Sequence, residues 1–405
     1  MQKTTKYKTV MLILFGISAI FNLAAFSKTF CDRYTEHVYP HIADTFGRLS
    51  APLPFAAGEV LAVLGGVLLL TALTVLILLP FLRKKQGYRR FCGRIWKTVL
   101  AVLNVLLLLT TFQYLIPVRC TPIAAQSSRT DFSYEEIYRA EEYIVNGANE
   151  AAAEIPLDEN GMAVFPSAEE LDRRAMDALA ALAPEYPRLA GYYPPVKNSL
   201  FSDILERMNI GGMTLEYTME LIHNRYSCQP LYLPVLDTHE MAHHKGFYRE
   251  SEAEFISTLA MIRSEDPFLR LSGYIEIERF MTDAYNQAVD AVADEMIAAG
   301  ELEPLPDHIS IKDPRLREYL QKLHEHIRQQ PYFSSLVNTL RDQSDGIATK
   351  IYQADSHPID NMPAVNEAIG EIADVGWETQ AAVLKEHNYD GMALLYLQYF
   401  DGKLY

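Results

Sequence analysis

The sequence has 405 residues, of which 49% are hydrophobic, and its formal net charge is −16. The charge is uneven, because 13 of the 36 Lys and Arg residues but 4 of the 52 Asp and Glu residues precede Arg119, which leaves a net charge of −25 on the rest of the chain. Such an acidic chain repels phosphate backbones, so nucleic acid is excluded as an expected partner.

Three long apolar runs without charged residues occupy residues 9–27, 60–82 and 98–118. Each has about the 20 residues that a helix needs to cross the hydrocarbon core of a bilayer, and a charge inside such a run would be costly. We therefore predict a membrane domain with three transmembrane helices over residues 1–118, with the lipid bilayer as its partner. The first run also fits a cleaved signal peptide, an alternative that the two later runs disfavour.

The charges next to these runs predict their orientation. The loop between the second and third runs holds seven basic residues, and three more precede the first run. Basic residues in short loops stay in the cytoplasm. An odd number of spans then places residues 119–405 outside it. We predict a multi-pass protein of the cytoplasmic membrane with an extracytoplasmic domain.

The four cysteines, Cys31, Cys92, Cys120 and Cys228, have neither CxxC nor Cys–His metal spacing. Three of them face the outside in this topology, and an odd number cannot all pair within one chain. A disulfide between Cys120 and Cys228 and free, buried thiols both remain open.

The remaining pattern predicts an α-rich α+β domain with a small sheet over residues 119–405. In chain order we expect a polar tether at 120–131, helices over 133–150 and 168–182 capped by Ser133 and Ser167, an extended piece and a helix over 197–208, a turn at Gly211–Gly212, a strand over 213–222, a helix that begins at Pro234, and further helices over 250–397 with breaks near 304–306, 331 and 357–358.

The motif His239-Glu240-Met241-Ala242-His243 lies within the helix that begins at Pro234. Residues four apart lie on one helical face, so both histidines can present imidazole nitrogens to one ion, and Zn²⁺ accepts such ligands readily. Glu240 lies next to the first ligand, where it can take a proton from the bound water as the catalytic base. A purely structural zinc site is disfavoured, because such sites use four Cys or His ligands and no cysteine is near.

A catalytic zinc site needs a third protein ligand. Gly246 ends the motif helix, and a second helix begins near Arg249 with three glutamates. An acidic residue four positions after a ligand often orients a ligand histidine from outside the metal shell. Because Glu250 and Glu254 have this spacing, we predict Glu250 as the ligand and Glu254 as the outer carboxylate, with Glu252 as the alternative ligand.

These motifs resemble a bacterial membrane family of unknown function with a zincin-type HExxH motif, three N-terminal transmembrane helices and an outside domain. The resemblance covers most of the chain and is sharp from residue 194 to 259. It rests on His239 to Phe247, Glu250-Ser251-Glu252-Ala253-Glu254-Phe255, Pro194-Pro195-Val196-Lys197, Gly211-Gly212 and Asp345-Gly346-Ile347. The pattern E-x-x-A-(D/N) is also similar to gluzincins such as the prenyl-protein and heat-shock membrane proteases, where the first Glu binds zinc, which supports Glu250. This chain departs from that pattern at Glu254, where those families have Asp or Asn.

The expected function is that of a gluzincin-like zinc metallopeptidase, a membrane-anchored hydrolase. We expect it to cleave peptide or protein substrates outside the cytoplasm by a zinc-bound water, with Glu240 as the general base. The strand over 213–222 is either an edge strand that pairs with an extended peptide or an ordinary structural strand. A non-catalytic zincin-fold sensor or scaffold at the cell surface is the alternative, which the complete set of Glu240 and three ligands disfavours.

A Tyr or His that stabilises the oxyanion is expected, but the 24 tyrosines do not single one out. His223 and His244 lie outside the motif spacing, and we expect them to be structural or surface residues.

Overall fold

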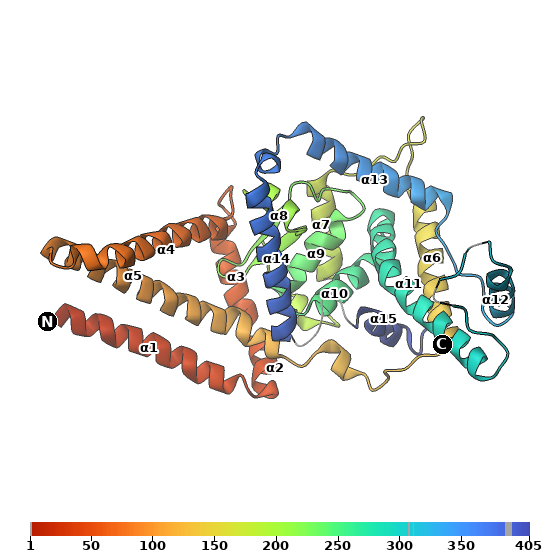
Figure 1. Cartoon of the computed structure of the whole chain (residues 1–405), viewed down its shortest axis with the longest axis horizontal. Coiled ribbons are helices and arrows are strands. Elements are labelled where there is room, and N and C mark those ends of the chain that lie inside the picture. Colours follow the sequence, from red (N-terminus) through yellow and green to blue (C-terminus); the bar gives the residue numbers. More distant parts are fainter. Residues whose placement is uncertain (1, 307, 311, 385–390) are drawn as a thin grey trace.

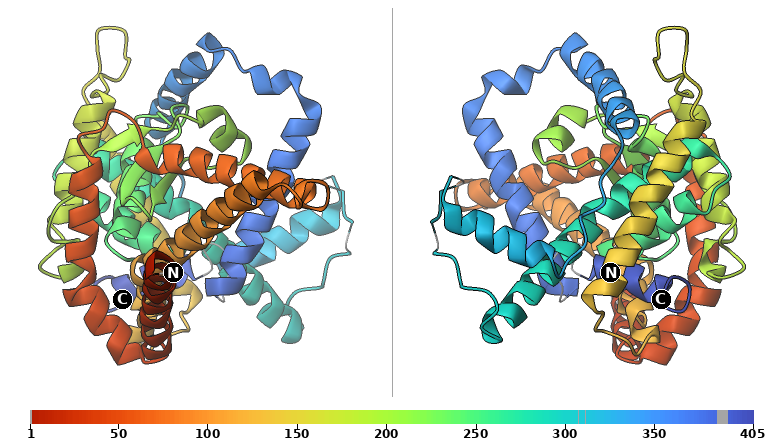
Figure 2. Two further views of the ribbon diagram at one scale, coloured as in Figure 1. Left: turned by 90° about the vertical axis from the view of Figure 1, so that its left-hand side faces the viewer. Right: turned by 90° about the vertical axis from the view of Figure 1, so that its right-hand side faces the viewer.

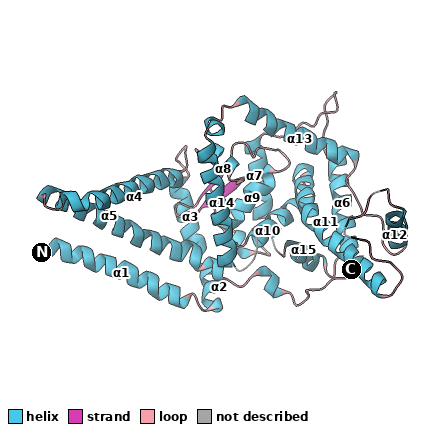
Figure 3. Cartoon of the chain, viewed as in Figure 1, coloured by secondary structure: helices cyan, strands magenta, loops and turns pink. Residues whose placement is uncertain are grey.

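The computed structural model describes residues 2–306, 308–310, 312–384 and 391–405. It is mostly helical with one small sheet (Figure 3), which confirms the predicted α-rich α+β class. Three long helices project from one side of a helical body (Figure 1). The elements in chain order are α1 (Gln2–Ala24), α2 (Lys28–His37), α3 (Tyr39–Ser50), α4 (Ala57–Leu82), α5 (Gln86–Thr110), η1 (Thr111–Leu115), η2 (Pro117–Arg119), η3 (Ile123–Gln126), α6 (Tyr134–Glu154), α7 (Ala168–Ala180), η4 (Pro187–Leu189), β1 (Val196–Asn198), α8 (Ser202–Arg207), β2 (Gly212–Leu215), β3 (Glu220–His223), α9 (Leu233–His244), α10 (Glu250–Ile262), α11 (Pro267–Ala298), α12 (Pro314–His324), α13 (Ser335–Ala354), η5 (Pro358–Asn361), α14 (Pro363–Leu384) and α15 (Met392–Phe400).

The projecting helices α1, α4 and α5 are long and apolar enough to cross a membrane, over Lys6–Ala24, Ala57–Leu82 and Gln86–Arg119. Their side chains are mostly exposed, as lipid-facing side chains would be. The third span begins earlier than predicted, because the basic segment that precedes its apolar run is already helical. It also continues past α5 through the π-helical turn η1. The structure therefore supports a membrane-associated protein with three candidate spans.

Helices α2 and α3, which lie between the first two spans, pack onto the body. Tyr39 at the start of α3 is fully buried. Its hydroxyl donates to the carbonyl of His244 at 3.1 Å and lies 3.0 Å from the hydroxyl of Tyr248. A domain boundary after residue 118 stays a prediction, but residues from this inter-span segment share a hydrophobic cluster with residues far beyond that boundary.

The main core forms where α11 packs along α6 and α10. Ser133 caps α6 through reciprocal bonds with Glu136, and Ser167 caps α7, as predicted. Gly147 of α6 lies directly against the ring of Tyr274 in α11, an approach that a larger residue would prevent. Helices α7 and α10 also pack against α9, so α9 lies inside the body.

The sheet has the strand order β1-β3-β2, with β1 parallel and β2 antiparallel to β3. The prediction of one strand over 213–222 is wrong, because this segment is a hairpin of β2 and β3 joined at residues 216–219. Met219 in the turn has a φ of 53°, in the left-handed region. The turn, Glu-Tyr-Thr-Met, contains no Gly, Asn or Asp to signal a reversal. Gly212, predicted in a turn, is the first residue of β2.

All four cysteines are free thiols, so the disulfide between Cys120 and Cys228 that the sequence left open is not formed. Cys31, Cys92 and Cys120 are buried. The sulfur of Cys120 lies 2.9 Å from the hydroxyl oxygen of Thr35, and burial raises the pKa of this thiol to about 11. The thiol is therefore protonated at neutral pH and poorly reactive.

Replacing Gly147 with Ala tests how closely α6 and α11 pack. The added Cβ would overlap the ring of Tyr274, and overpacking of this kind should lower the free energy of unfolding by about 1–3 kcal/mol. Gly346→Ala in α13 is the matched control, because nothing lies within 4 Å of its Cβ; it should stabilise the helix by up to about 1 kcal/mol. Thermal unfolding of the purified protein measures both, and equal shifts would contradict the close contact.

Candidate metal centre

The HExxH motif lies on α9, which is enclosed by the body. Pro234 occupies its first turn, a position where the missing N–H of proline costs nothing. Almost every residue of the helix is buried, including His239 and Glu240. Helices α7 and α10 and strands β2 and β3 pack around it. Buried polar groups must find partners inside the protein, so the contacts of these side chains define the site.

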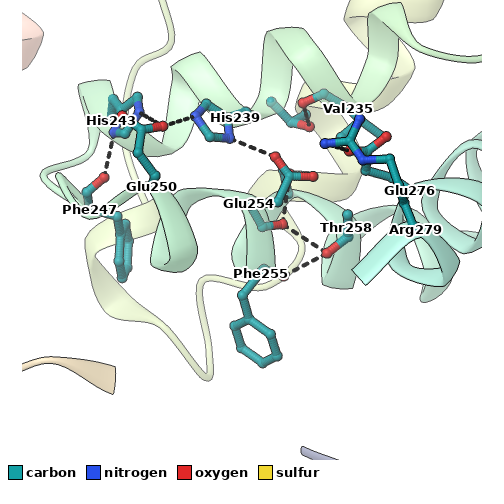
Figure 4. Close-up of polar contacts among 12 residues, drawn as sticks. Val235, His239, His243, Phe247, Glu250, Glu254, Phe255, Thr258, Glu276 and Arg279 are labelled. Atoms are coloured by element: carbon teal, nitrogen blue, oxygen red, sulfur yellow. Dashed lines mark hydrogen bonds and ion pairs between the residues drawn. The ribbon is translucent and has the colours of Figure 1, made fainter. Parts of the chain in front are cut away.

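His239, His243 and Glu250 converge on one point (Figure 4). The two imidazole rings lie 4.6 Å apart, as expected one turn apart on a helix. Oε2 of Glu250 lies 3.1 Å from Nε2 of His239 and 3.6 Å from Nε2 of His243. One ligand atom from each of the three residues lies within 4.8 Å of the other two. The structure therefore brings the three residues that the sequence predicts as zinc ligands into one group.

The other ring nitrogen of each histidine is held by an acceptor. Nδ1 of His239 lies 2.9 Å from Oε2 of Glu254, and Nδ1 of His243 lies 2.7 Å from the carbonyl oxygen of Phe247 (Figure 4). An imidazole that donates from Nδ1 keeps a lone pair on Nε2, and it is the two Nε2 atoms that face Glu250. Two neutral imidazoles and one carboxylate suit Zn²⁺ and leave one position open.

Gly246 brings the second helix back to the first. It follows α9 with a φ of 89°, a left-handed conformation that ends helices. A Cβ at this position would also lie 3.1 Å from Thr35 and Tyr39. After this turn Arg249 caps α10, so Glu250 is its first residue and Glu254 follows one turn later. One helical turn therefore separates the glutamate that faces Nε2 of His239 from the glutamate that faces its Nδ1.

Burial and mutual attraction set the protonation of the group. Burial opposes protonation of His239, but the carboxylates of Glu250 and Glu254 outweigh it and raise its pKa well above the ordinary value. The pKa of His243 is raised in the same way, with Glu250 outweighing burial. Burial alone would raise the pKa of Glu250, but His243 and His239 hold it well below its usual range. A positive charge is therefore strongly favoured between the two imidazoles and the carboxylate of Glu250.

Glu240 lies in the same cleft, on the side of the sheet. The hydroxyl of Thr214 in β2 lies 3.1 Å from its Oε2 and 2.7 Å from its backbone oxygen. A Cβ on Gly212 would lie 2.9 Å from Cγ of Glu240, so glycine at the start of β2 leaves room for the side chain. Burial, opposed by His243 and His239, raises the pKa of Glu240. These neighbours hold the carboxylate in place and favour its uptake of a proton.

Two further glutamates flank this arrangement. Glu252, the alternative ligand, points away from the histidines and accepts a hydrogen bond from the backbone N–H of Ile123 at 2.7 Å. Glu276 of α11 lies behind Glu254 and pairs with Arg279 at 3.0 Å (Figure 4). Burial and the charge of Glu254 raise the pKa of Glu276 to about 7. No local pattern marks Glu276, which comes from a helix that begins beyond the motif.

A cleft of about 450 Å³ opens over the metal group. Besides the group and Glu240, its lining includes the start of β2, Glu216 of the hairpin turn, Tyr114 of η1, Tyr232 before α9, Tyr248 after it, and Ala373 and Gly376 of α14. The hydroxyls of Tyr114 and Tyr232 make no hydrogen bond within the described part of the chain, whereas Tyr248 donates to the carbonyl of Gln113 at 2.5 Å. Apart from Gly211-Gly212 and the segment that follows, no local pattern in the sequence marks these lining residues, because they come from five separate segments.

His223 and His244 lie outside the metal group. Nδ1 of His223 lies 3.1 Å from Asp237, and its Nε2 lies 3.2 Å from Asn198. His244 is completely buried against α3, and burial lowers its pKa to about 3. Both histidines are packed among other side chains away from the metal group, as we expected from the sequence.

Comparison with known proteins identifies a family. The model of the family described as "Protein of unknown function (DUF3810)" matches residues 34–342, more than half of the chain. The match runs from α2 into α13 and includes the whole metal group. No curated protein and no solved structure matches the chain. Asp345-Gly346-Ile347, one of the stretches that suggested a family resemblance, lies just beyond the matched residues.

Binding of Zn²⁺ to this group should release protons at neutral pH. Despite burial, Glu250 and Glu254 raise the pKa of His239 and Glu250 raises that of His243, so a bound ion competes with protons for both imidazoles. Calorimetric titration in buffers of different ionisation enthalpy should show release of up to about two protons per ion, and the affinity should fall as the pH falls.

A matched pair of variants identifies the third ligand. Glu250→Gln should weaken zinc binding by more than about 100-fold, beyond the 10–100-fold typical for the loss of an outer hydrogen-bond partner. Glu252→Gln, on the same helix, should leave the affinity unchanged because Glu252 faces Ile123. Equal affinities of the two variants would contradict the assignment of Glu250.

Proposed function

The chain belongs to the DUF3810 family, and we propose that it is a membrane-anchored zinc metallopeptidase of the gluzincin type. One observation carries the proposal. Two imidazoles from α9 and a carboxylate from α10 converge on one point. The Nδ1 atom of each imidazole already has a hydrogen-bond acceptor, and Glu240 lies beside the group in an open cleft. This combination fits hydrolysis better than a closed structural site, which would use four protein ligands.

The ligands of the proposed site are His239, His243 and Glu250, and Glu254 orients the first of them. A Zn²⁺ ion held there lowers the pKa of water and polarises the carbonyl of a bound peptide. Glu254 accepts a hydrogen bond from Nδ1 of His239. This bond fixes the ring and makes Nε2 a stronger electron-pair donor to a metal ion. The glutamate at position 254 reaches the imidazole at 2.9 Å, so the departure from Asp or Asn at this position is compatible with the role.

Glu240 is the proposed general base. Its carboxylate takes a proton from the attacking water and later gives it to the leaving amine, which is general acid–base catalysis by one group. The pKa raised by burial suits both halves of this cycle. Thr214 holds the carboxylate from the side of β2, so the proton is accepted and returned at nearly the same position.

Strand β2 is a suitable surface for the substrate. It is one of the two edge strands of the sheet, and Gly212, Met213 and Thr214 line the cleft. An extended peptide that pairs with its backbone would be held by main-chain hydrogen bonds across the metal group. The sequence-based idea of an edge strand thus applies to β2 alone, since β3 is the central strand. Tyr114 and Tyr232 are the candidates to stabilise the oxyanion, because both hydroxyls reach the cleft without another partner in the described chain.

We place the catalytic body outside the cytoplasm, with the three spans in the cytoplasmic membrane. The support is the basic segment from Arg83 to Lys97, which comprises the loop between α4 and α5 and the first turns of α5. The acidic body, with its net charge of −25 beyond residue 118, has no comparable basic segment next to the spans.

Glu240→Gln should stop hydrolysis and leave zinc in place. The amide keeps the size of the side chain but cannot take a proton, so the rate should fall by about 10²–10⁴-fold. The assay compares cleavage of a mixed peptide library, read by mass spectrometry, with the zinc content of the same samples. Thr214→Val is a control that should lower the rate less.

The Glu240→Gln variant also distinguishes a peptidase from a non-catalytic sensor or scaffold. Full hydrolysis by Glu240→Gln would contradict the role of this residue. A cellular phenotype that survives Glu240→Gln but is lost with Glu250→Gln would favour a zinc-dependent sensor or scaffold.

Reporter fusions test the orientation. Alkaline phosphatase, which is active outside the cytoplasm, should be active when fused after Tyr405 and inactive when fused in the loop near Gln86. The reverse pattern would place the body inside the cell and contradict our assignment.

A further inference from the structure

The metal cleft is built directly against the end of the third candidate span. Tyr114 of η1 lines the cleft, and its ring packs edge-on against Tyr248 at 5.1 Å. The Tyr248 ring lies 6.2 Å from that of His243. The hydroxyl of Thr110, the last residue of α5, lies 3.1 Å from that of Tyr217 in the hairpin turn. One tyrosine side chain thus separates the metal group from a span that crosses the bilayer.

The start of the second span is fixed to the same sheet. The backbone N–H groups of Ala57 and Gly58 donate to Glu220 of β3 at 3.0 and 2.8 Å. Glu59 in the first turn of α4 accepts from the hydroxyl of Ser199, next to β1, at 2.5 Å. Two of the three candidate spans are therefore attached at their ends to the sheet that lines the cleft.

Helix α14 runs across the ends of the spans. In Figure 1 it lies between the projecting helices and the rest of the body and is oriented transverse to them; the left view in Figure 2, which looks along the spans, shows it lengthwise. Ala373 and Gly376 of α14 line the metal cleft, and Ile369 is buried on the same side. The helix is thus one wall of the cleft.

The other sides of α14 have contrasting chemistry. Val365, Ile372 and Val375 are 42%, 64% and 63% exposed and lie on one side of the helix at 100° per residue. The acidic residues form a separate stripe on the side that points further from the cleft, and all are exposed: Glu367, Glu371, Asp374 and Glu378. A transverse helix with such an apolar stripe has the form of helices that lie in a membrane surface.

We infer that the apolar stripe of α14, defined by Val365, Ile372 and Val375, lies in the bilayer surface and that the metal cleft accepts polypeptide segments anchored in the same membrane. The occupant of the stripe is lipid because α14 lies across the level at which the projecting helices end (Figures 1 and 2), and the same bilayer that surrounds α4 and α5 reaches it there. The lipid in contact with the helix is uncharged, because the acidic stripe of α14 would repel anionic headgroups. The choice of substrate rests on the proposed peptidase function.

Fluorescent labels on single cysteines test the lipid contact. The full chain with Cys228→Ser, since the other three thiols are buried, is placed in phosphatidylcholine nanodiscs, and the environment-sensitive label NBD is attached at Ile372→Cys or Val375→Cys. Both labels should emit at shorter wavelength than in water and lose fluorescence when doxyl-labelled lipid is included. Adding phosphatidylglycerol should weaken both effects.

Two controls make the outcome specific. Asp374→Cys carries the label on the acidic stripe of the same helix, and Val164→Cys carries it on a valine that is 56% exposed in a hairpin remote from the spans in Figure 1. Both should emit as in water. Labels at 372 and 375 that match these controls would overturn the inference. A shift to shorter wavelength without quenching by doxyl lipid would also overturn it, since it would mean a protein contact.

The substrate class is tested with one peptide library in two forms, free and carrying a palmitoyl chain, presented to the protein in the same nanodiscs. The lipidated library should be cleaved faster at equal total concentration, with Glu240→Gln inactive on both. Equal rates would overturn the substrate class. No cleavage of either form would contradict the proposed peptidase function instead, and the label measurement would still decide where α14 lies.

Discussion

At Gly246 the backbone enters the left-handed region with a φ of 89°, and α10 folds back beside α9. The positions of Glu250 and Glu254 depend on this reversal, since the first must reach both Nε2 atoms and the second must reach Nδ1 of His239. The turn leaves no space for a side chain, because α2 and α3 press on it from the other side. The metal group is therefore set by helix packing rather than by the motif alone.

The charges around this turn are costly to bury. Glu240, Glu250, Glu254 and Glu276 are all buried within a few contacts of His239. Buried carboxylates persist where they are paired or coordinate a cation. In the structure the histidines favour positive charge there, and burial and the charge of Glu254 raise the pKa of Glu276 to about 7, so this carboxyl is readily neutralised. A divalent ion would supply the positive charge.

Local patterns in the sequence predicted the parts of the molecule that obey local rules. The caps at Ser133 and Ser167 follow from short-range hydrogen bonding, and the spans follow from composition. The spacing of His239, His243 and Glu250 follows from helical geometry, and the structure brings these residues together. Long-range features could not be predicted in this way. The hairpin at 216–219 has no turn residue to mark it, and Tyr114 reaches the cleft from more than 100 positions before the metal motif. The roles of the site residues remain proposals from their geometry.

The position of α2 and α3 between the first two candidate spans determines how the chain can be divided. Tyr39 closes the back of the turn after α9, so part of the support for the metal group comes from the segment between the first two candidate spans. A catalytic unit joined to its anchor by a simple tether can be moved by recombination to another anchor, or released as a secreted enzyme. Here such an exchange would remove the support for the turn. A fragment that begins after α3 would therefore lack the contacts that Tyr39 makes with His244 and Tyr248.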